Sequence, residues 1–151
     1  MLSYDEETKY LAAGSGMLRD VATIMLETGM RPEEIYRILP ANVHLPKNYL
    51  LNPFGTTKVA KRRIELTARA KSILERRISE CKGKYLFAHD GDPDKPVPKV
   101  NNAHDHAVRS SKVTAFRLYD LGHTFATRAA EAGVDLVTLA SMLGHSKRST
   151  W

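Results

Sequence analysis

Apolar side chains recur at helical spacing along most of the chain. In residues 16–28 they return every three or four positions, which predicts an amphipathic helix that Gly29 ends as a cap. Ser3 and Glu6 have the spacing of a capping box and predict an earlier helix. Pro32 favours the start of the next helix, because proline suits the first helical position.

The periodicity changes after Pro40, which ends that helix. Residues 42–66 contain two or three short strand candidates separated by turn residues. Thr67 can cap a helix over 68–82, in which Cys81 keeps the apolar spacing, so Cys81 is interpreted as a core side chain rather than a reactive thiol. Further on, the pattern predicts a short strand or buried turn at 85–88, a loop at 89–98, a helix over 99–112, and two closing helical segments broken at Gly133 and Gly144.

These elements predict one domain over residues 1–151, mainly α with a small antiparallel β-sheet or hairpin (α+β). A chain of 151 residues is long enough to bury a real core. With one cysteine, an internal disulfide framework and a cysteine-rich zinc site are excluded. No apolar run approaches a membrane span and no signal peptide opens the chain, so we expect a cytoplasmic protein.

The charge balance adds a candidate partner. Lys and Arg number 23 against 17 Asp and Glu, a net charge of +6 at pH 7. A basic balance favours a polyanionic partner, most often nucleic acid, although charge alone supports a merely basic soluble protein about as well.

Two basic positions are candidates for binding a phosphate. Arg31 follows Gly29 at a corner, where a guanidinium can bind a phosphate bidentately; an ordinary salt bridge to Glu34 is the favoured alternative for this residue alone. Lys58 lies at the expected tip of a hairpin, where a lysine can enter a nucleic-acid groove; a solvated charged turn is the alternative. The same run also contains Lys61, Arg62 and Arg63.

Histidines supply the remaining candidates. His123 and His145 lie on different closing segments and could donate to a phosphate or move a proton, whereas core or capping roles are the usual alternative. His104 and His106 are two residues apart, which is poor spacing for two ligands on one helix face, and no third ligand is evident. No metal site and no cofactor are therefore expected.

The order of the motifs is more specific than any one of them. "TGMRPEEI" at 28–35, a basic hairpin, "YDLGHTFATRAAEAG" at 119–133 and "LGHS" at 143–146 follow one another. This arrangement resembles the catalytic domain of the tyrosine recombinase (phage integrase) family over roughly residues 11–150. The resemblance implies that family's fold, duplex DNA as partner, and DNA breaking and rejoining through a phosphotyrosine link without a metal or nucleotide.

The resemblance also assigns roles by position. Arg31 matches the first arginine, and Lys58 the hairpin lysine, with Lys61 as a rival. Tyr119 stands where a histidine is usual, and Gly122 where the second arginine is expected. The remaining assignments are His145 at the later His/Trp position, and Lys61, Arg62, Lys112 and His123 as supporting DNA contacts. We expect Arg31, Lys58, Tyr119, Gly122 and His145 to converge on one concave basic face.

Two departures from the family pattern predict weakened chemistry. Gly122 removes a phosphate clamp, and losing one preorganised donor typically costs ~10²–10³ in rate. The family's nucleophilic tyrosine lies about nine residues past the "GH" histidine, which falls beyond Trp151, and its separate N-terminal DNA-clamping domain has no counterpart in these residues. The sequence therefore predicts an inactive catalytic domain, either a remnant or a trimmed form, that is monomeric in isolation and able to assemble further on DNA.

Two alternatives stay open. One is a non-catalytic DNA-binding remnant or regulator. The other, from a different class, is a metal-free phosphodiesterase or ribonuclease that would use His123 and His145 on one phosphate.

Overall fold

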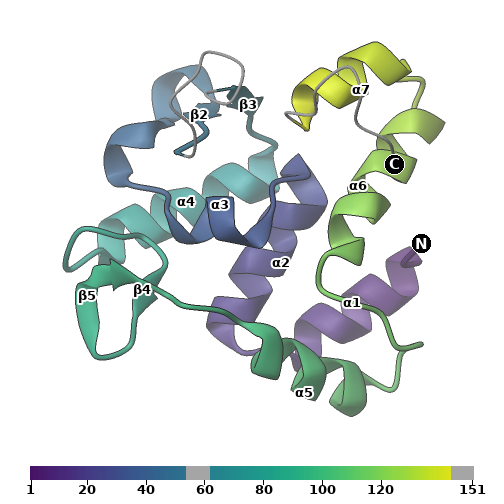
Figure 1. Ribbon diagram of the computed structural model, residues 1–151, viewed down its shortest axis with the longest axis horizontal. Helices are drawn as coiled ribbons and strands as arrows, with labels where there is room; N and C mark the ends of the chain where they lie inside the picture. The colour runs from purple at the N-terminus through teal and green to yellow at the C-terminus, as the bar shows by residue number, and fades with distance from the viewer. Residues whose placement is uncertain (54–61, 144–151) are drawn as a thin grey trace.

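A computed structural model describes residues 1–53 and 62–143, and helices dominate this part of the chain. The helix α2 is central in Figure 1 and contacts α1, α3, α4 and α6. The helices are α1 (Tyr4–Ala13), α2 (Gly16–Thr28), α3 (Pro32–Tyr36), α4 (Ala68–Glu80), α5 (Asn101–Ser111), α6 (Asp120–Glu131) and α7 (Leu136–Met142), with 3₁₀ turns at Pro40–Asn42 and Leu45–Lys47. In the described residues no helix is long and apolar enough to cross a membrane.

The predicted caps are confirmed at three helix ends. Ser3 and Glu6 form the capping box of α1, and the Thr67 hydroxyl accepts from Ala70 N–H at the start of α4. At the end of α2, Gly29 adopts the left-handed conformation with φ of 72°. That conformation carries little cost for glycine, which is why the chain can turn there.

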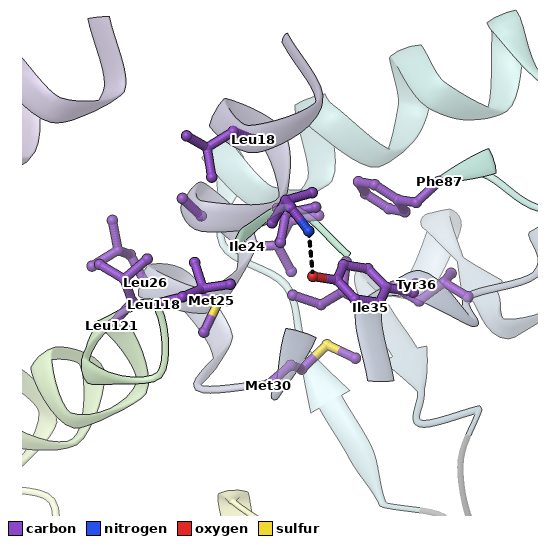
Figure 2. Close-up of a cluster of buried hydrophobic side chains, with 14 of the residues drawn as sticks. Leu18, Ile24, Met25, Leu26, Met30, Ile35, Tyr36, Phe87, Leu118 and Leu121 are labelled. Atoms are coloured by element: carbon purple, nitrogen blue, oxygen red, sulfur yellow. Dashed lines mark hydrogen bonds between the residues drawn. The ribbon is translucent and has the colours of Figure 1, made fainter. Parts of the chain in front are cut away.

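The main core lies between α2 and the elements around it. Figure 2 shows Ile24 and Met25 of α2 among a cluster that also includes Ile35 and Leu121. In the same cluster the Tyr36 hydroxyl accepts from Val100 N–H at 3.3 Å, so the chain just before α5 is fixed to α3. Burial raises the pKa of the Tyr36 phenol.

The helices α1 and α5 pack together through a buried polar contact. His104 Nδ1 lies 2.6 Å from the Tyr10 hydroxyl, and its Nε2 lies 2.8 Å from the Phe116 carbonyl oxygen. Both ring nitrogens are therefore used inside the fold, while His106 is exposed and contacts Ser110. This arrangement gives His104 a structural role, and the part of the chain that the structure describes has no cluster of three or more possible metal ligands.

Two small antiparallel sheets interrupt the helices. The strands β1 (Val43–His44), β2 (Tyr49–Leu51) and β3 (Arg63–Glu65) form the sheet predicted for residues 42–66, with Leu50 opposite Ile64 on its buried side. The prediction of a loop at 89–98 is wrong, because β4 (Ala88–His89) and β5 (Asp92–Pro96) pair there. The Asp90–Gly91 dipeptide between them is a common hairpin sequence, and the prolines of β5 lie in an edge strand, where a missing N–H is tolerated.

The two closing helices form their own apolar contact. Ala126 of α6 packs with Leu139 and Leu143, while Phe125 lies at the edge of this cluster. The break predicted at Gly133 is confirmed, since Gly133 has φ of 97° between α6 and α7. Gly144 lies outside the described residues.

Candidate functional site

The corner between α2 and α3 presents Arg31. The Thr28 hydroxyl donates to the Ile24 carbonyl at 2.6 Å and accepts from Met30 N–H at 3.2 Å, which fixes the turn around Gly29. Arg31 follows in an extended conformation as the N-cap of α3. Its side chain is 48% exposed, and its Nη1 lies 3.8 Å from Glu34 Oε2. The salt-bridge partner expected from sequence is therefore present, yet the pair is long and the guanidinium remains accessible.

Glu34 is the buried acceptor behind this corner. Its carboxylate accepts from Arg31 N–H at 2.8 Å and from Asn52 Nδ2 at 2.9 Å. The guanidinium of Arg62 donates to both carboxylate oxygens, at 2.9 and 3.1 Å. Burial by itself raises the pKa of Glu34, but the hydrogen bonds and charge of Arg62, with smaller contributions from Arg31, outweigh it and hold the pKa below the ordinary value.

The sequence suggests Arg62 as a contact with DNA, whereas the structure places its side chain inside the fold. Its side chain is 8% exposed, and besides Glu34 it donates from Nε to the Met142 carbonyl at 2.9 Å. Arg62 thus joins the start of β3 to α3 and to the end of α7. The spacing of Glu34 three residues after Arg31 would have indicated its capping role, but nothing in the sequence pairs Glu34 with Arg62.

Two residues of interest lie at the start of α6. Tyr119 is 48% exposed, and its hydroxyl donates to Glu33 of α3. Gly122 is in the first turn of α6, and among residues 1–53 and 62–143 a Cβ built there would meet no heavy atom within 4 Å outside its own helix backbone. The space that the described residues leave around Gly122 therefore admits a larger side chain, and their packing provides no reason for a glycine there.

The end of α7 also reaches the Gly29 corner. A Cβ at Gly29 would lie 2.4 Å from Leu143 Cδ2 and 2.6 Å from Phe125 Cδ2. The backbone of α2 thus touches α6 and the last described residue of the chain. Only glycine permits both this approach and the left-handed φ.

These contacts bring several of the predicted positions together. Arg31 and Tyr119 belong to elements joined by the Glu33 hydrogen bond, and Gly122 is one turn after Tyr119. Asn52 and Arg62 stand on either side of residues 54–61 in the sequence, and both side chains contact Glu34. The predicted Lys58, Lys61 and His145 lie outside the described residues.

His123 and Lys112 have other surroundings. His123 is exposed, with Nδ1 3.8 Å from Asp120 Oδ1, and it lines a cavity of about 410 Å³ together with Asp120 and Glu6. The carboxylates of Asp120 and Glu6, which line this cavity, disfavour a phosphate there. Lys112 is exposed at the end of α5, the helix that packs against α1 (Figure 1).

Comparison with known proteins identifies relatives of this arrangement. The sequence model described as the Phage integrase family matches residues 5–151. Tyrosine recombinase XerC of Staphylococcus saprophyticus is 32% identical over 146 residues, which cover 88% of this chain and 47% of the relative. Tyrosine recombinase XerD of Chlorobaculum tepidum is 30% identical over 142 residues, covering 86% of this chain and 46% of the relative. The chain thus spans about half the length of these curated relatives.

Solved structures have the same fold. The crystal structure of XerA recombinase superimposes with a TM-score of 0.78 at 22% identity, covering 97% of this chain and 55% of the other. The Tn1549 transposon integrase in complex with circular intermediate DNA gives a TM-score of 0.84 at 19% identity, covering 97% and 59%. The predicted fold class, mainly helical with small antiparallel sheets, is confirmed.

Proposed function

The chain belongs to the phage integrase family, and from that premise we propose that it is the phosphate-binding part of a site-specific DNA recombinase. One observation carries the proposal. The elements that hold Arg31, Tyr119 and Gly122 meet at one corner, where Tyr119 contacts Glu33 and where Gly29 touches Phe125 and Leu143.

The proposed chemistry is phosphoryl transfer on duplex DNA. Negative charge develops on the phosphate oxygens in the transition state, so preorganised donors around the phosphate lower the barrier. Arg31 supplies a half-exposed guanidinium, and Tyr119 supplies a phenol that can donate in place of a histidine. By position in the family motif, His145 is a further donor and Lys58 protonates the leaving 5′-oxygen.

Gly122 limits this chemistry. The family pattern has an arginine here, and a glycine offers neither a charge nor a side-chain donor. The open space around Gly122 supports loss of a side chain without a packing benefit. We therefore propose that the chain binds DNA while its strand cleavage is strongly reduced, which makes a non-catalytic DNA-binding role the second candidate.

The phosphodiesterase alternative is less well supported. It requires His123 to act on a phosphate, yet Glu6 and Asp120 line the same cavity. The partner proposed here is duplex DNA, bound by a cytoplasmic protein that is monomeric in isolation and assembles further on its target.

Fluorescence anisotropy with unrelated duplexes tests the proposed binding. Phosphate contacts dominate non-specific affinity, so the dissociation constant should rise steeply as salt is added. Replacing Lys58 and Lys61 with alanine should weaken binding to all sequences about equally and reduce the salt slope by about 1 for each lost phosphate contact.

The matched control is the pair Lys82→Ala and Lys95→Ala, which removes the same charge from exposed positions just after α4 and in β5. This pair should leave the salt slope close to that of the unchanged chain. Affinity that ignores ionic strength, or absence of binding at low salt, would refute the proposed function.

A further inference from the structure

The hydrogen bond between Tyr119 and Glu33 uses the donor that the proposed function assigns to the phosphate. A phenol has one proton, so Tyr119 can donate to one acceptor at a time. In this structure the acceptor is the Glu33 carboxylate, which reaches across from the first turn of α3. An anionic group of the protein thus accepts the hydrogen bond that the proposed function gives to a phosphate oxygen.

Glu33 differs from its neighbour Glu34 in what neutralises it. Glu34 is buried and paired with Arg62 and Arg31, so its charge is compensated inside the fold. Glu33 is exposed, and among residues 1–53 and 62–143 the ion pairs do not include it. Its exposed carboxylate therefore lies at the corner between α2 and α3 without an ion pair in this part of the chain.

We propose that Glu33 is a positioning residue that holds the Tyr119 hydroxyl in the free protein and yields it to a DNA phosphate. The inference rests on the proposed function. On binding, the phenol exchanges a carboxylate oxygen for a phosphate oxygen of the same charge sign. Because the two anions repel each other, Glu33 lowers affinity and keeps the corner closed to weakly held anions.

Two substitutions separate the charge of Glu33 from its hydrogen bond. In Glu33→Gln the side-chain amide oxygen can still accept from Tyr119, but the negative charge is gone. In Glu33→Ala both are lost. Glu131→Gln is the control, since it removes one exposed carboxylate from the far end of α6 and changes net charge equally.

The first measurement is NMR of protein labelled with ¹³C at tyrosine Cζ, with Tyr119→Phe identifying the Tyr119 resonance. In the free protein this resonance should move in Glu33→Gln and in Glu33→Ala, and stay in place in Glu131→Gln. Addition of duplex DNA should bring it to one common position in the unchanged chain and in both Glu33 variants. The proposal is overturned if the chemical shift of the Tyr119 resonance does not change in the Glu33 variants, or does not change when DNA is bound.

The second measurement is DNA affinity at low salt. Glu33→Gln should bind roughly three- to tenfold tighter than the unchanged chain, from the loss of one nearby like charge, and Glu131→Gln less than about twofold tighter. Equal effects of the two substitutions overturn the proposal while leaving the proposed function intact. If no variant shows salt-dependent binding, the proposed function is refuted instead. The proposed exchange of Glu33 for a phosphate as the acceptor of Tyr119 is then refuted as well.

Discussion

At the scale of single residues, Glu34 holds together the elements that meet at the corner. It joins α3 to Arg62 and Asn52 from a buried position. Replacing Glu34 with Gln leaves the Arg62 guanidinium buried without a counter-charge. Breaking one side of a buried pair costs about 3–5 kcal/mol, so the free energy of unfolding should fall by about that much in urea denaturation followed by circular dichroism.

Glu65→Gln is the control for this substitution. Glu65 pairs with Arg63 at the surface, where side chains are more than half exposed, and such pairs contribute about 0–1 kcal/mol. A loss in Glu34→Gln no larger than in Glu65→Gln would contradict the role given to Glu34.

The depressed pKa of Glu34 adds a pH dependence. Its stabilising contribution is complete above the ordinary pKa of 4.5 and is lost as pH falls through the lower folded value. The free energy of unfolding of the unchanged chain should therefore decline below about pH 4.5 more steeply than that of Glu34→Gln. Parallel curves for the two proteins would count against this assignment.

The two glycines of the corner should respond in opposite directions to alanine. Gly122→Ala should raise the free energy of unfolding by about 0.5–1 kcal/mol, because alanine favours a helix and the space is open. Gly29→Ala should lower it by about 2–4 kcal/mol, through its left-handed φ and the overlap with Leu143 and Phe125. Thermal and urea unfolding of both variants is the test, and similar behaviour would contradict the packing described.

The sequence could indicate some of these residue roles and not others. The positions of Gly29 and Arg31 at the corner can be predicted from a local motif, because the end of one helix and the start of the next depend on neighbouring residues. The pairing of Arg62 with Glu34 spans 28 positions and depends on how β3 meets α3. A run of basic residues does not reveal which member turns inward, so the sequence alone suggests Arg62 as a DNA contact.

At the scale of elements, the cap of α4 also joins two helices. The Thr67 hydroxyl accepts from Ala70 N–H and donates to Glu27 of α2 at 3.0 Å. Thr67→Ala should lower the free energy of unfolding by about 1–2 kcal/mol, the usual cost of losing a cap. Thr67→Ser keeps the hydroxyl and should stay within about 0.5 kcal/mol of the unchanged chain. Equal losses in both variants would show that the methyl group, and not the cap, matters.

Element prediction worked where chemistry and periodicity agreed. The helices α2 and α4 have cap residues and regular apolar spacing, and α1 has its capping box; each lies where the sequence predicts a helix. The sequence does not reveal the β4–β5 hairpin, because prolines at 93, 96 and 98 favour a loop. An edge strand tolerates these prolines, because their missing N–H groups can face the side without a neighbouring strand. Whether a strand lies at an edge depends on the tertiary structure.

At the scale of the whole molecule, the order of the motifs along the chain is enough to predict the fold. How α2, α3, α6 and α7 meet at the corner depends instead on contacts between segments far apart in the sequence.

The functional prediction at this scale concerns covalent adducts on nicked duplex DNA. The 151 residues contain no tyrosine after Tyr119. Extending the chain so that a tyrosine lies about nine residues past His145 should give at most trace adduct.

Combining that extension with Gly122→Arg should give readily detected adduct, while Gly122→Arg alone should give none, because groups that act as a unit are not additive. A denaturing gel of the four proteins is the measurement. Abundant adduct from the unextended chain would contradict the assignment, and attachment at Tyr119 would make that residue the nucleophile.

The attachment of α1 has a consequence for the order of folding. Leu2 N–H donates to the Thr124 hydroxyl across 122 positions, and Arg128 of α6 donates to Glu7 at 2.6 Å. Ribosomes add about 5–20 residues per second, so roughly 6–25 s separate the synthesis of these partners. During that interval α1 lacks its contacts with α6, so a chaperone that covers nascent apolar surface has time to bind this helix.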